Sequence, residues 1–206
     1  MVRVRAGGAC YGRSVMTAGF ALFETAIGPC GIAWGERGVV GVQLPERSEA
    51  ATRARLRRRF LDVPETPPPA AVQRAIEGIV ALLEGERRDL ADVALDMASV
   101  PAFERGVYEV ARTIAPGATL TYGEIAARLG AQGDARAVGE ALGQNPFPIV
   151  VPCHRVLAAH GRTGGFSANG GIATKLRLLS IEGARTSSGP TLFENLPLVA
   201  APRRRR

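Results

Sequence analysis

Short runs of apolar and β-branched residues fill the chain from Ala18 to Leu44. The segments between these runs are rich in glycine, proline and charged residues, which are typical of turns. Brief apolar runs that alternate with turns are typical of strands that pair with their neighbours in sequence. The pattern therefore predicts a three-stranded antiparallel meander with strands at residues 19–25, 30–34 and 38–44.

Two helices are predicted after the sheet, because apolar residues now recur at every third or fourth position. The first covers residues 48–60, starts with Ser48 as its N-cap, and carries a row of arginines that is most often a solvated face. The prolines at 67–69 separate it from a second helix at 70–84. The first half of the chain is therefore expected to be an α+β unit.

Helical patterns replace strand patterns beyond Pro101, which places a domain boundary near residues 90–100. One apolar stripe predicts a helix over residues 103–114. Thr121 and Glu124 stand at the spacing of a capping box, so a further short helix is expected to begin there. The second half is expected to be mostly α.

That short helix ends at Gly130, and another is predicted over residues 134–142. The pair has the helix-turn-helix pattern of DNA-binding proteins, although an ordinary helical hairpin gives the same pattern and is commoner. Small side chains along the second helix, with Arg136 near its start, favour the DNA alternative, because they let the backbone approach nucleic acid closely.

The charge balance is compatible with a polyanionic partner. The chain has 26 Lys and Arg residues against 19 Asp and Glu residues, a net charge of +7, and a pI near 10.3. Every basic residue except Lys175 is an arginine. A coding bias toward arginine, with the charge solvated on the surface, would give the same composition.

Composition excludes several classes of protein. Hydrophobic residues make up 46% and charged residues 22%, as in globular proteins, so wholesale disorder is excluded. No apolar run reaches the roughly 18–20 residues of a membrane span, and no signal peptide is visible, so a cytoplasmic protein without a membrane partner is expected. Residues 1–17 and 188–206 are expected to be disordered. Three cysteines and two histidines are too scattered for a zinc site, so no metal is expected.

The segment 145–156, with the sequence NPFPIVVPCHRV, carries the clearest chemical signal. Its three prolines predict that Cys153 is held at a rigid, non-helical position. A free thiol is only a few per cent ionised at neutral pH, so a nucleophilic cysteine needs a base or a positive environment, which the adjacent His154 and Arg155 offer. The alternative is a buried structural thiol beside a core histidine, which is the commoner situation for an isolated Cys-His pair.

Two further features favour the nucleophile. The segment follows the candidate DNA-binding helix, and it precedes a glycine-rich loop at residues 161–171 that is suited to lining a flat pocket. A last helix is predicted over residues 172–181.

Taken together, these residues resemble the DNA repair alkyltransferases, that is, the methylated-DNA–protein-cysteine methyltransferases that act on 6-O-alkylguanine. The resemblance covers roughly residues 20–183. It is densest after Thr121, where the motifs PCHRV (152–156), RAVG (136–139) and NP (145–146) occur at the family's spacing.

The resemblance implies a role for each polar residue of the site. Cys153 would accept the alkyl group, and Glu182 would activate it through His154 and a water. Asn145 would fix the active-site turn. Tyr122 would donate the proton that the leaving guanine oxygen needs.

The resemblance also implies how DNA is bound. The damaged base would be rotated out of the duplex, and Arg136 would fill the vacated stack. The surface around Ala137 would suit the minor groove, where Tyr122 and the backbone at Ser167 also meet the nucleotide. The pocket wall would consist of Leu142, Pro148, Thr163, Gly164, Phe166 and Ser167.

For the whole molecule the resemblance implies a ribonuclease H-like first domain (18–98) and a winged-helix-like second domain (99–187). It implies a monomer that acts once, without a cofactor, on double-stranded DNA containing alkylated bases, including 4-O-methylthymine. The family's pocket aromatic is often tyrosine, and here it is Phe166. Some relatives hold zinc in the first domain, but no histidine precedes His154 here.

Two other functions remain open. A non-catalytic protein that binds alkylated DNA, or a helix-turn-helix regulator, would share the DNA-binding helices without using Cys153. A Cys-His hydrolase ranks below both, because adjacent residues do not by themselves supply the geometry of a catalytic dyad.

Overall fold

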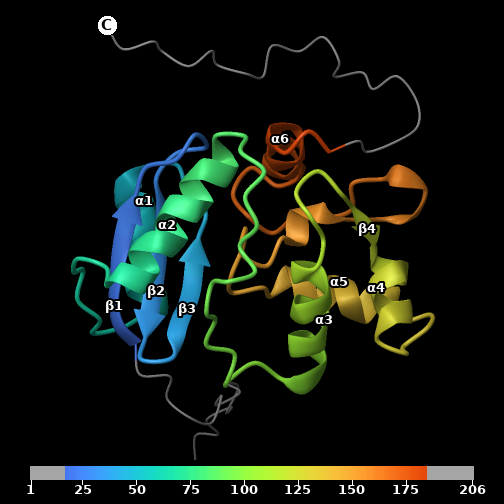
Figure 1. Ribbon diagram of the computed structural model, residues 1–206, viewed down its shortest axis with the longest axis horizontal. Helices are drawn as coiled ribbons and strands as arrows, with labels where there is room; N and C mark the ends of the chain where they lie inside the picture. Colours follow the sequence, from blue (N-terminus) through green and yellow to red (C-terminus); the bar gives the residue numbers. More distant parts are fainter. Residues whose placement is uncertain (1–16, 185–206) are drawn as a thin grey trace, which may run out of the picture.

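The computed structural model describes residues 17–184. A small sheet with two helices lies beside a second, mainly helical group of elements (Figure 1). The sheet is antiparallel in the order β1-β2-β3, with β1 at Thr17–Phe23, β2 at Cys30–Gly35 and β3 at Gly38–Gln43. The expected α+β class and the three-stranded meander are confirmed, and each strand lies within two residues of its predicted position.

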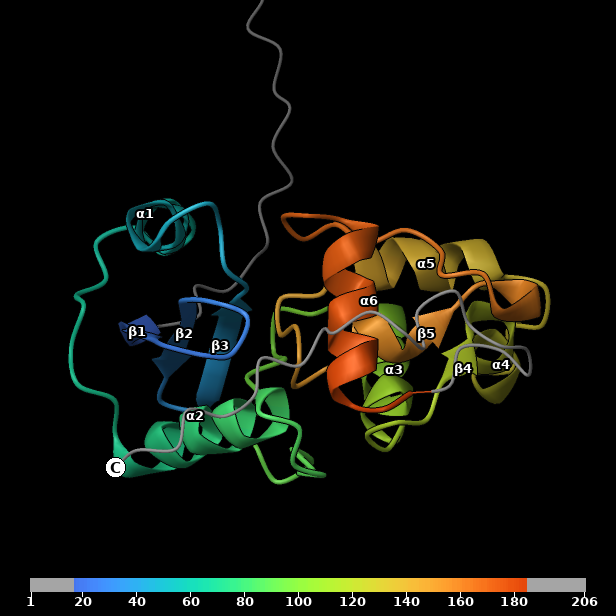
Figure 2. The ribbon, with the colours of Figure 1, turned by 90° about the horizontal axis from the view of Figure 1, so that it is seen from above.

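The helices α1 (Glu49–Arg59) and α2 (Ala70–Leu83) cover opposite faces of this sheet (Figure 2). Strand residues alternate between the two faces. Phe20 and Ala33 pack with Leu56 of α1, whereas Ile32 belongs to the larger core that includes α2. Ser48 caps α1 as predicted, since its hydroxyl accepts from the backbone N–H of residue 51.

The outer edge of β3 is paired with loops rather than left open. Val39 exchanges backbone hydrogen bonds with the segment 94–96, at 2.9 and 2.8 Å. Further along, the Val42 N–H donates to the carbonyl of Pro146 at 2.9 Å. Covered edges do not recruit other strands. The second bond also ties the sheet to the loop that leads to Cys153.

The second group consists of α3 (Ala102–Arg112), α4 (Tyr122–Arg128), α5 (Ala135–Gly143) and α6 (Ile172–Ile181). The predicted capping box is present. The Thr121 hydroxyl accepts from the Glu124 N–H at 3.1 Å, and the Glu124 carboxylate accepts from the Thr121 N–H at 2.6 Å. Asp134 caps α5 in the same way. The helices therefore start where the capping residues predict.

This half is mostly α, as expected, but it also contains two short strands that the sequence did not predict. Residues 120–121 form β4 and residues 156–157 form β5, and the two pair in parallel with Leu120 opposite Val156. Strands of two residues are too short to show alternation, and their partners lie far apart in sequence. This pair joins the segment that leads into α4 to the segment that follows Cys153.

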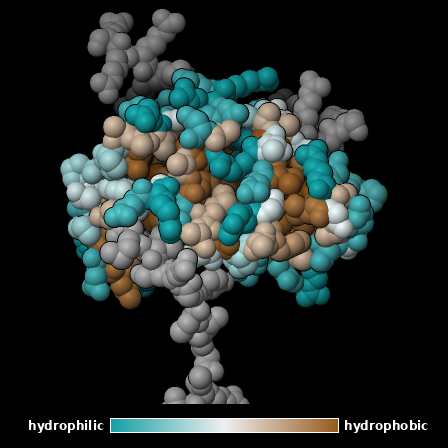
Figure 3. Space-filling view, turned by 60° about the horizontal axis from the view of Figure 1, so that its bottom comes forward, coloured by the Kyte–Doolittle hydropathy of each residue, from teal (hydrophilic) through white to brown (hydrophobic). Residues whose placement is uncertain are grey.

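The described surface is mixed in polarity. Hydrophobic atoms form separate patches between hydrophilic side chains on the face shown in Figure 3. Among residues 17–184 the large apolar side chains that are exposed are Leu61, Phe103 and Ile172. No helix in this range is both long enough and apolar enough to cross a membrane.

The division of the chain between residues 98 and 99 stays a prediction. The expected disordered leader lies almost entirely outside the described residues, as does the basic tail. Within the described range, Arg112 of α3 joins the two groups of elements, since its guanidinium donates to the carbonyls of residues 90, 91 and 93.

Candidate active site

The turn before Cys153 is held by Asn145. Its side-chain N–H donates to the Val151 carbonyl, and its Oδ1 accepts from the Phe147 N–H, both at 2.9 Å. Ile149 is fully buried with a φ of 75°, a conformation that costs a β-branched residue of the order of 1–3 kcal/mol. Asn145 thus sits where it can fix a strained turn.

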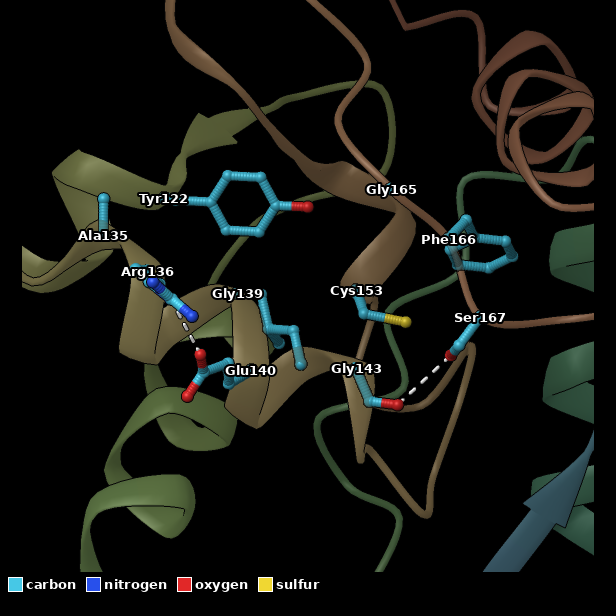
Figure 4. A pocket seen from close by; sticks show the side chains of 11 residues that line it. Tyr122, Ala135, Arg136, Gly139, Glu140, Gly143, Cys153, Gly165, Phe166 and Ser167 are labelled. Carbon is cyan, nitrogen blue, oxygen red and sulfur yellow. Dashed lines mark hydrogen bonds and ion pairs between the residues drawn. The ribbon is translucent and has the colours of Figure 1, made fainter.

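Cys153 lies in a single 3₁₀ turn, Cys153–Arg155, so the expected non-helical position is wrong. Pro152 precedes the turn, and a proline is tolerated there because no helical N–H is required of it. The sulfur is turned toward Phe166 and Ser167 and away from Arg136 (Figure 4). With 9% of the residue exposed, Cys153 forms part of a cavity wall rather than of the open surface.

Tyr122 lines this cavity together with Cys153. It follows β4 directly, and the parallel pairing holds this end of the 120–122 segment beside the strand that follows Cys153. Gly164 passes close to the Tyr122 ring, and a Cβ added at Gly164 would lie 2.9 Å from the phenolic oxygen. The φ of Gly164 is also positive, at 68°. A glycine there lets the loop press against the tyrosine.

A buried network lies behind Cys153. The His154 Nε2 is 2.9 Å from the Glu182 Oε1, so these two residues are in direct contact. Arg155 donates to both Glu182 oxygens at 2.8 Å and also to the Ile114 carbonyl. His154 Nδ1 is buried without a hydrogen-bond partner among the described residues. The direct contact leaves no place for a relay water between His154 and Glu182.

This network fixes the charge of its members. Burial raises the pKa of the Glu182 carboxyl, but the hydrogen bonds and charges of His154 and Arg155 lower it more, to about 2. Burial lowers the pKa of His154, against the opposing effect of Glu182. At neutral pH the network holds a carboxylate, a neutral imidazole and a guanidinium.

The thiol of Cys153 is not ionised at rest. Burial raises its pKa, although contacts with Asn145, the charge of Lys175 and nearby amides act in the opposite direction. The sequence suggests Arg155 as a positive neighbour, but that side chain is committed to Glu182. The thiol therefore has to lose its proton when it reacts.

The cation beside Cys153 is Lys175, which the sequence argument missed. It lies on α6, it is fully buried, and its Nζ donates to the Val156 carbonyl at 2.6 Å. The Nζ also stands 5.7 Å from the centroid of the Tyr122 ring. Burial lowers the pKa of Lys175 to about 8, against the effect of Cys153. One signal was available: Lys175 shares a helical face with Leu178 and Leu179, which are both core residues.

A cavity of about 630 Å³ opens over Cys153 toward α5. Three of the residues expected in the pocket wall line it, namely Leu142, Phe166 and Ser167, together with Tyr122, the expected proton donor. Arg136 stands at its rim with 91% of its side chain exposed, 3.0 Å from Glu140. Pairs of this exposed i,i+4 kind contribute about 0.5 kcal/mol or less, so Arg136 is easily released.

Not every expected residue meets the cavity. Of the expected pocket wall, Pro148, Thr163 and Gly164 are not among the residues that line it: Pro148 lines a neighbouring cavity, and Gly164 packs against the Tyr122 ring. Ala137 lies on α5 without facing the cavity. The cavity instead includes small residues of α5 and the loop that were not predicted: Gly139, Gly143 and Gly165.

No group of three metal-ligating side chains occurs within residues 17–184. The described cysteines, Cys30 and Cys153, are both free thiols.

Acid should destabilise the protein through the buried network. The pKa of Glu182 is about 2 in the folded protein and about 4.3 in the unfolded chain. The ionised carboxylate therefore stabilises the fold above about pH 4.3, and this stabilisation is lost as the pH falls toward 2. The neutral His154 acts in the same direction below about pH 6.5. We expect the free energy of unfolding, measured with urea, to fall by about 3 kcal/mol from the Glu182 effect between pH 6 and pH 2. A flat pH profile would contradict this charge assignment.

Proteins of known function resemble this chain in sequence and in structure. A sequence model described as "6-O-methylguanine DNA methyltransferase, DNA binding domain" matches residues 102–184. The methylated-DNA–protein-cysteine methyltransferase of Methanothermobacter thermautotrophicus is 36% identical over 153 residues, which are 74% of this chain and 78% of that protein. The protein of the same name from Mycobacterium tuberculosis is 43% identical over 129 residues, 63% of this chain and 76% of its own.

The solved structures agree. A crystal structure of Mycobacterium tuberculosis OGT in complex with DNA is similar with a TM-score of 0.63 and 31% identity, and it covers 83% of this chain and 96% of that one. The cysteine, its turn and the helices α4 and α5 all lie inside the matched DNA binding domain, so the fold and site define a DNA-binding domain that carries a cysteine in its pocket. The chain belongs to the methylated-DNA–protein-cysteine methyltransferase family.

Proposed function

We propose that this protein repairs DNA by transferring the alkyl group of 6-O-alkylguanine to its own Cys153. The observation that carries the proposal is the position of the Cys153 sulfur, in the wall of a cavity that opens toward α5 and is backed by the buried His154–Glu182–Arg155 network. The expected resemblance to the repair alkyltransferases and the membership of this family support the same activity. We extend the proposal to 4-O-methylthymine, whose oxygen carries the same group.

The transfer is a single displacement. The Cys153 proton passes through a water to His154 Nδ1, and the imidazolium that forms is stabilised by the Glu182 carboxylate on Nε2. The sulfur then bonds to the alkyl carbon while the carbon–oxygen bond breaks. Lys175, close to both Cys153 and Tyr122, favours the thiolate while it exists. The thioether that results is stable, so each molecule acts once.

The leaving guanine oxygen takes the electron pair and needs a proton. Tyr122 is the donor that we propose, because its phenol lies in the same cavity and its pKa is raised by burial and by Cys153. A raised pKa keeps the phenol protonated until the oxygen becomes basic. Asn145 serves the reaction through the turn that it fixes.

DNA would approach along α5. A guanine inside the duplex cannot reach a sulfur in a cavity wall, so the nucleotide has to rotate outward, at a cost of a few kcal/mol. Arg136 at the rim would occupy the space that the base leaves, and the narrow surface near Ala137 would face the minor groove. Ser167, whose hydroxyl donates to the Gly143 carbonyl at 3.2 Å, would present its backbone to the base beside Leu142 and Phe166, whereas Pro148 lines a neighbouring cavity.

An intact-mass measurement tests the function directly. After incubation with duplex DNA containing 6-O-methylguanine, the protein should gain about 14 Da, one methyl for one hydrogen, on the peptide with Cys153. A protein that binds this DNA but keeps its mass would be the non-catalytic binder or regulator instead.

Arg136→Ala should slow repair of duplex DNA by about ten- to a hundredfold, because the flipped state loses its stacking substitute. Reaction with the free base 6-O-benzylguanine should hardly change, since no base has to be flipped. Single-turnover rates on both substrates, followed by mass, make the comparison. Equal losses on both would remove the base-flipping role.

We also propose which fold families the two units belong to and in which form the protein acts. The first unit, residues 18–98, would be ribonuclease H-like, because helices cover both faces of its meander. The second, residues 99–187, would be winged-helix-like, because α4 and α5 form its helix pair. The protein would act in the cytoplasm as a monomer without cofactor or metal, since one chain carries every residue that the displacement uses.

A further inference from the structure

A second cavity, of about 360 Å³, also has Cys153 in its wall. It shares Phe166 and Ser167 with the cavity over α5 but extends the other way, to β3 and α1 of the sheet unit. In Figure 2, α1 and α5 lie toward the same side of the molecule. Cys153 therefore belongs to the walls of two neighbouring cavities, and the proposed function uses only the one over α5 for the base.

The geometry of the displacement indicates what the second cavity could hold. The attacking sulfur, the alkyl carbon and the leaving oxygen lie close to one line, so the other substituents of that carbon project sideways. A methyl group projects only hydrogens, but a longer adduct has to place its remaining atoms beside the line. The base fills the cavity over α5, which leaves the cavity toward α1 for those atoms.

The charges of this second cavity are one-sided. Arg55 and Arg59 of α1 line it, and no carboxylate does so among the described residues. Arg55 contacts Glu46 at 3.2 Å, whereas Arg59 has a long contact of 3.4 Å to the Pro146 carbonyl and lies 5.1 Å from the Phe60 ring centroid. With Glu46 included, this group of charges keeps a net charge of +1.

The environment of Arg59 favours an added anion. Partial removal from water lowers the pKa of its guanidinium, and the neighbouring charge of Arg55 lowers it further. A negative group between the two arginines would relieve their repulsion and accept charge-assisted hydrogen bonds.

We propose that the cavity between Cys153 and α1 holds the distal end of the transferred group, and that Arg55 and Arg59 favour 6-O-(carboxyalkyl)guanine adducts. This substrate class rests on the proposed function. The step itself is unchanged: the Sγ–C bond forms, the C–O bond breaks, and the guanine oxygen takes the electron pair and a proton. The carboxylate does not react and stays on the protein as part of the thioether.

Paired adducts of equal size test the proposal. Free guanines carrying 6-O-carboxymethyl, 2-carboxyethyl or 3-carboxypropyl groups are compared with the corresponding carboxamides, which are neutral. For each chain length the measured quantity is the rate with the carboxylate divided by the rate with the amide. At one or more chain lengths this ratio should be about fivefold larger for the parent protein than for Arg59→Gln, as expected for a partly exposed ion pair. Arg55→Gln should act in the same direction. The matched control is Arg58→Gln, which removes an exposed arginine of α1 that does not line the cavity.

The outcomes separate the alternatives. The free bases carry no phosphate, so they cannot report on binding of the DNA backbone. If Arg59→Gln slows the reaction of the carboxylates and not that of the carboxamides, the result supports the subsite. If Arg59→Gln instead slows all duplex substrates equally, including 6-O-methylguanine, and leaves the free bases unchanged, the arginines bind the DNA backbone and the proposal is overturned. An unchanged carboxylate-to-amide ratio also overturns it. If no 6-O-methylguanine is repaired by the parent protein, the proposed function itself fails.

Discussion

Cys153→Ser is expected to reduce alkyl transfer below detection while DNA binding persists. A serine hydroxyl is a far weaker nucleophile than a thiolate, and the His154 relay is arranged for a thiol that has to be deprotonated on the spot. The substitution changes one atom that is mostly buried, so the cavity and the α5 surface keep their shape. Intact mass after incubation with 6-O-methylguanine duplex measures transfer, and fluorescence anisotropy of the same duplex measures binding.

Cys30 provides the matched control. It is also a buried free thiol, but burial raises its pKa to about 12 and it packs in the core of the sheet, in contact with Thr25. Cys30→Ala should keep the adduct on the Cys153 peptide. Transfer that continues in Cys153→Ser, or that disappears in a folded Cys30→Ala protein, would show that the wrong sulfur has been assigned.

Glu182→Gln should have the second largest effect, on stability and on transfer together. The substitution leaves the Arg155 guanidinium buried without its counter-charge, which typically costs about 3–5 kcal/mol. It also removes the carboxylate that stabilises the His154 imidazolium, and losing such assistance slows proton transfer by about a hundredfold or more. Urea unfolding measures the first effect, and single-turnover transfer under conditions where circular dichroism shows a folded protein measures the second.

An exposed ion pair supplies the comparison for that experiment. Glu49 pairs with Arg53 one turn along α1, at 2.6 Å, with half of the Glu49 side chain exposed. Glu49→Gln should change the free energy of unfolding by no more than about 0.5 kcal/mol and leave transfer unchanged. If both glutamine variants behave alike, the buried network has no special role.

The sequence predicts the local elements of this protein well, because their signals are local. Ser48 and the Thr121–Glu124 capping box each start a helix where predicted, and α5 begins within one residue of its predicted start. The relation between distant residues is much harder to predict. The two-residue strands β4 and β5 are paired across 36 positions of the chain, from Leu120 to Val156, and have no periodicity to reveal them.

The candidate site shows the same contrast. Cys153, His154 and Asn145 fall in one segment and can be singled out from it, whereas the partner of Arg155 depends on how α6 packs. Adjacent residues suggest that Arg155 would face the thiol, but it turns to Glu182 and Lys175 takes that place. Adjacency in sequence says little about which charges meet inside a core.

The hydrogen bond from Val42 to the Pro146 carbonyl has a consequence for folding. Two further contacts join the same halves: Arg112 donates to the carbonyl of Leu90, and Arg177 donates to the carbonyl of Ala26. The two halves therefore stabilise each other. We expect two halves joined in this way to melt in a single transition rather than one after the other. The reactive loop then loses its shape only when the whole molecule does, so a folded molecule is also one whose loop is ready to react.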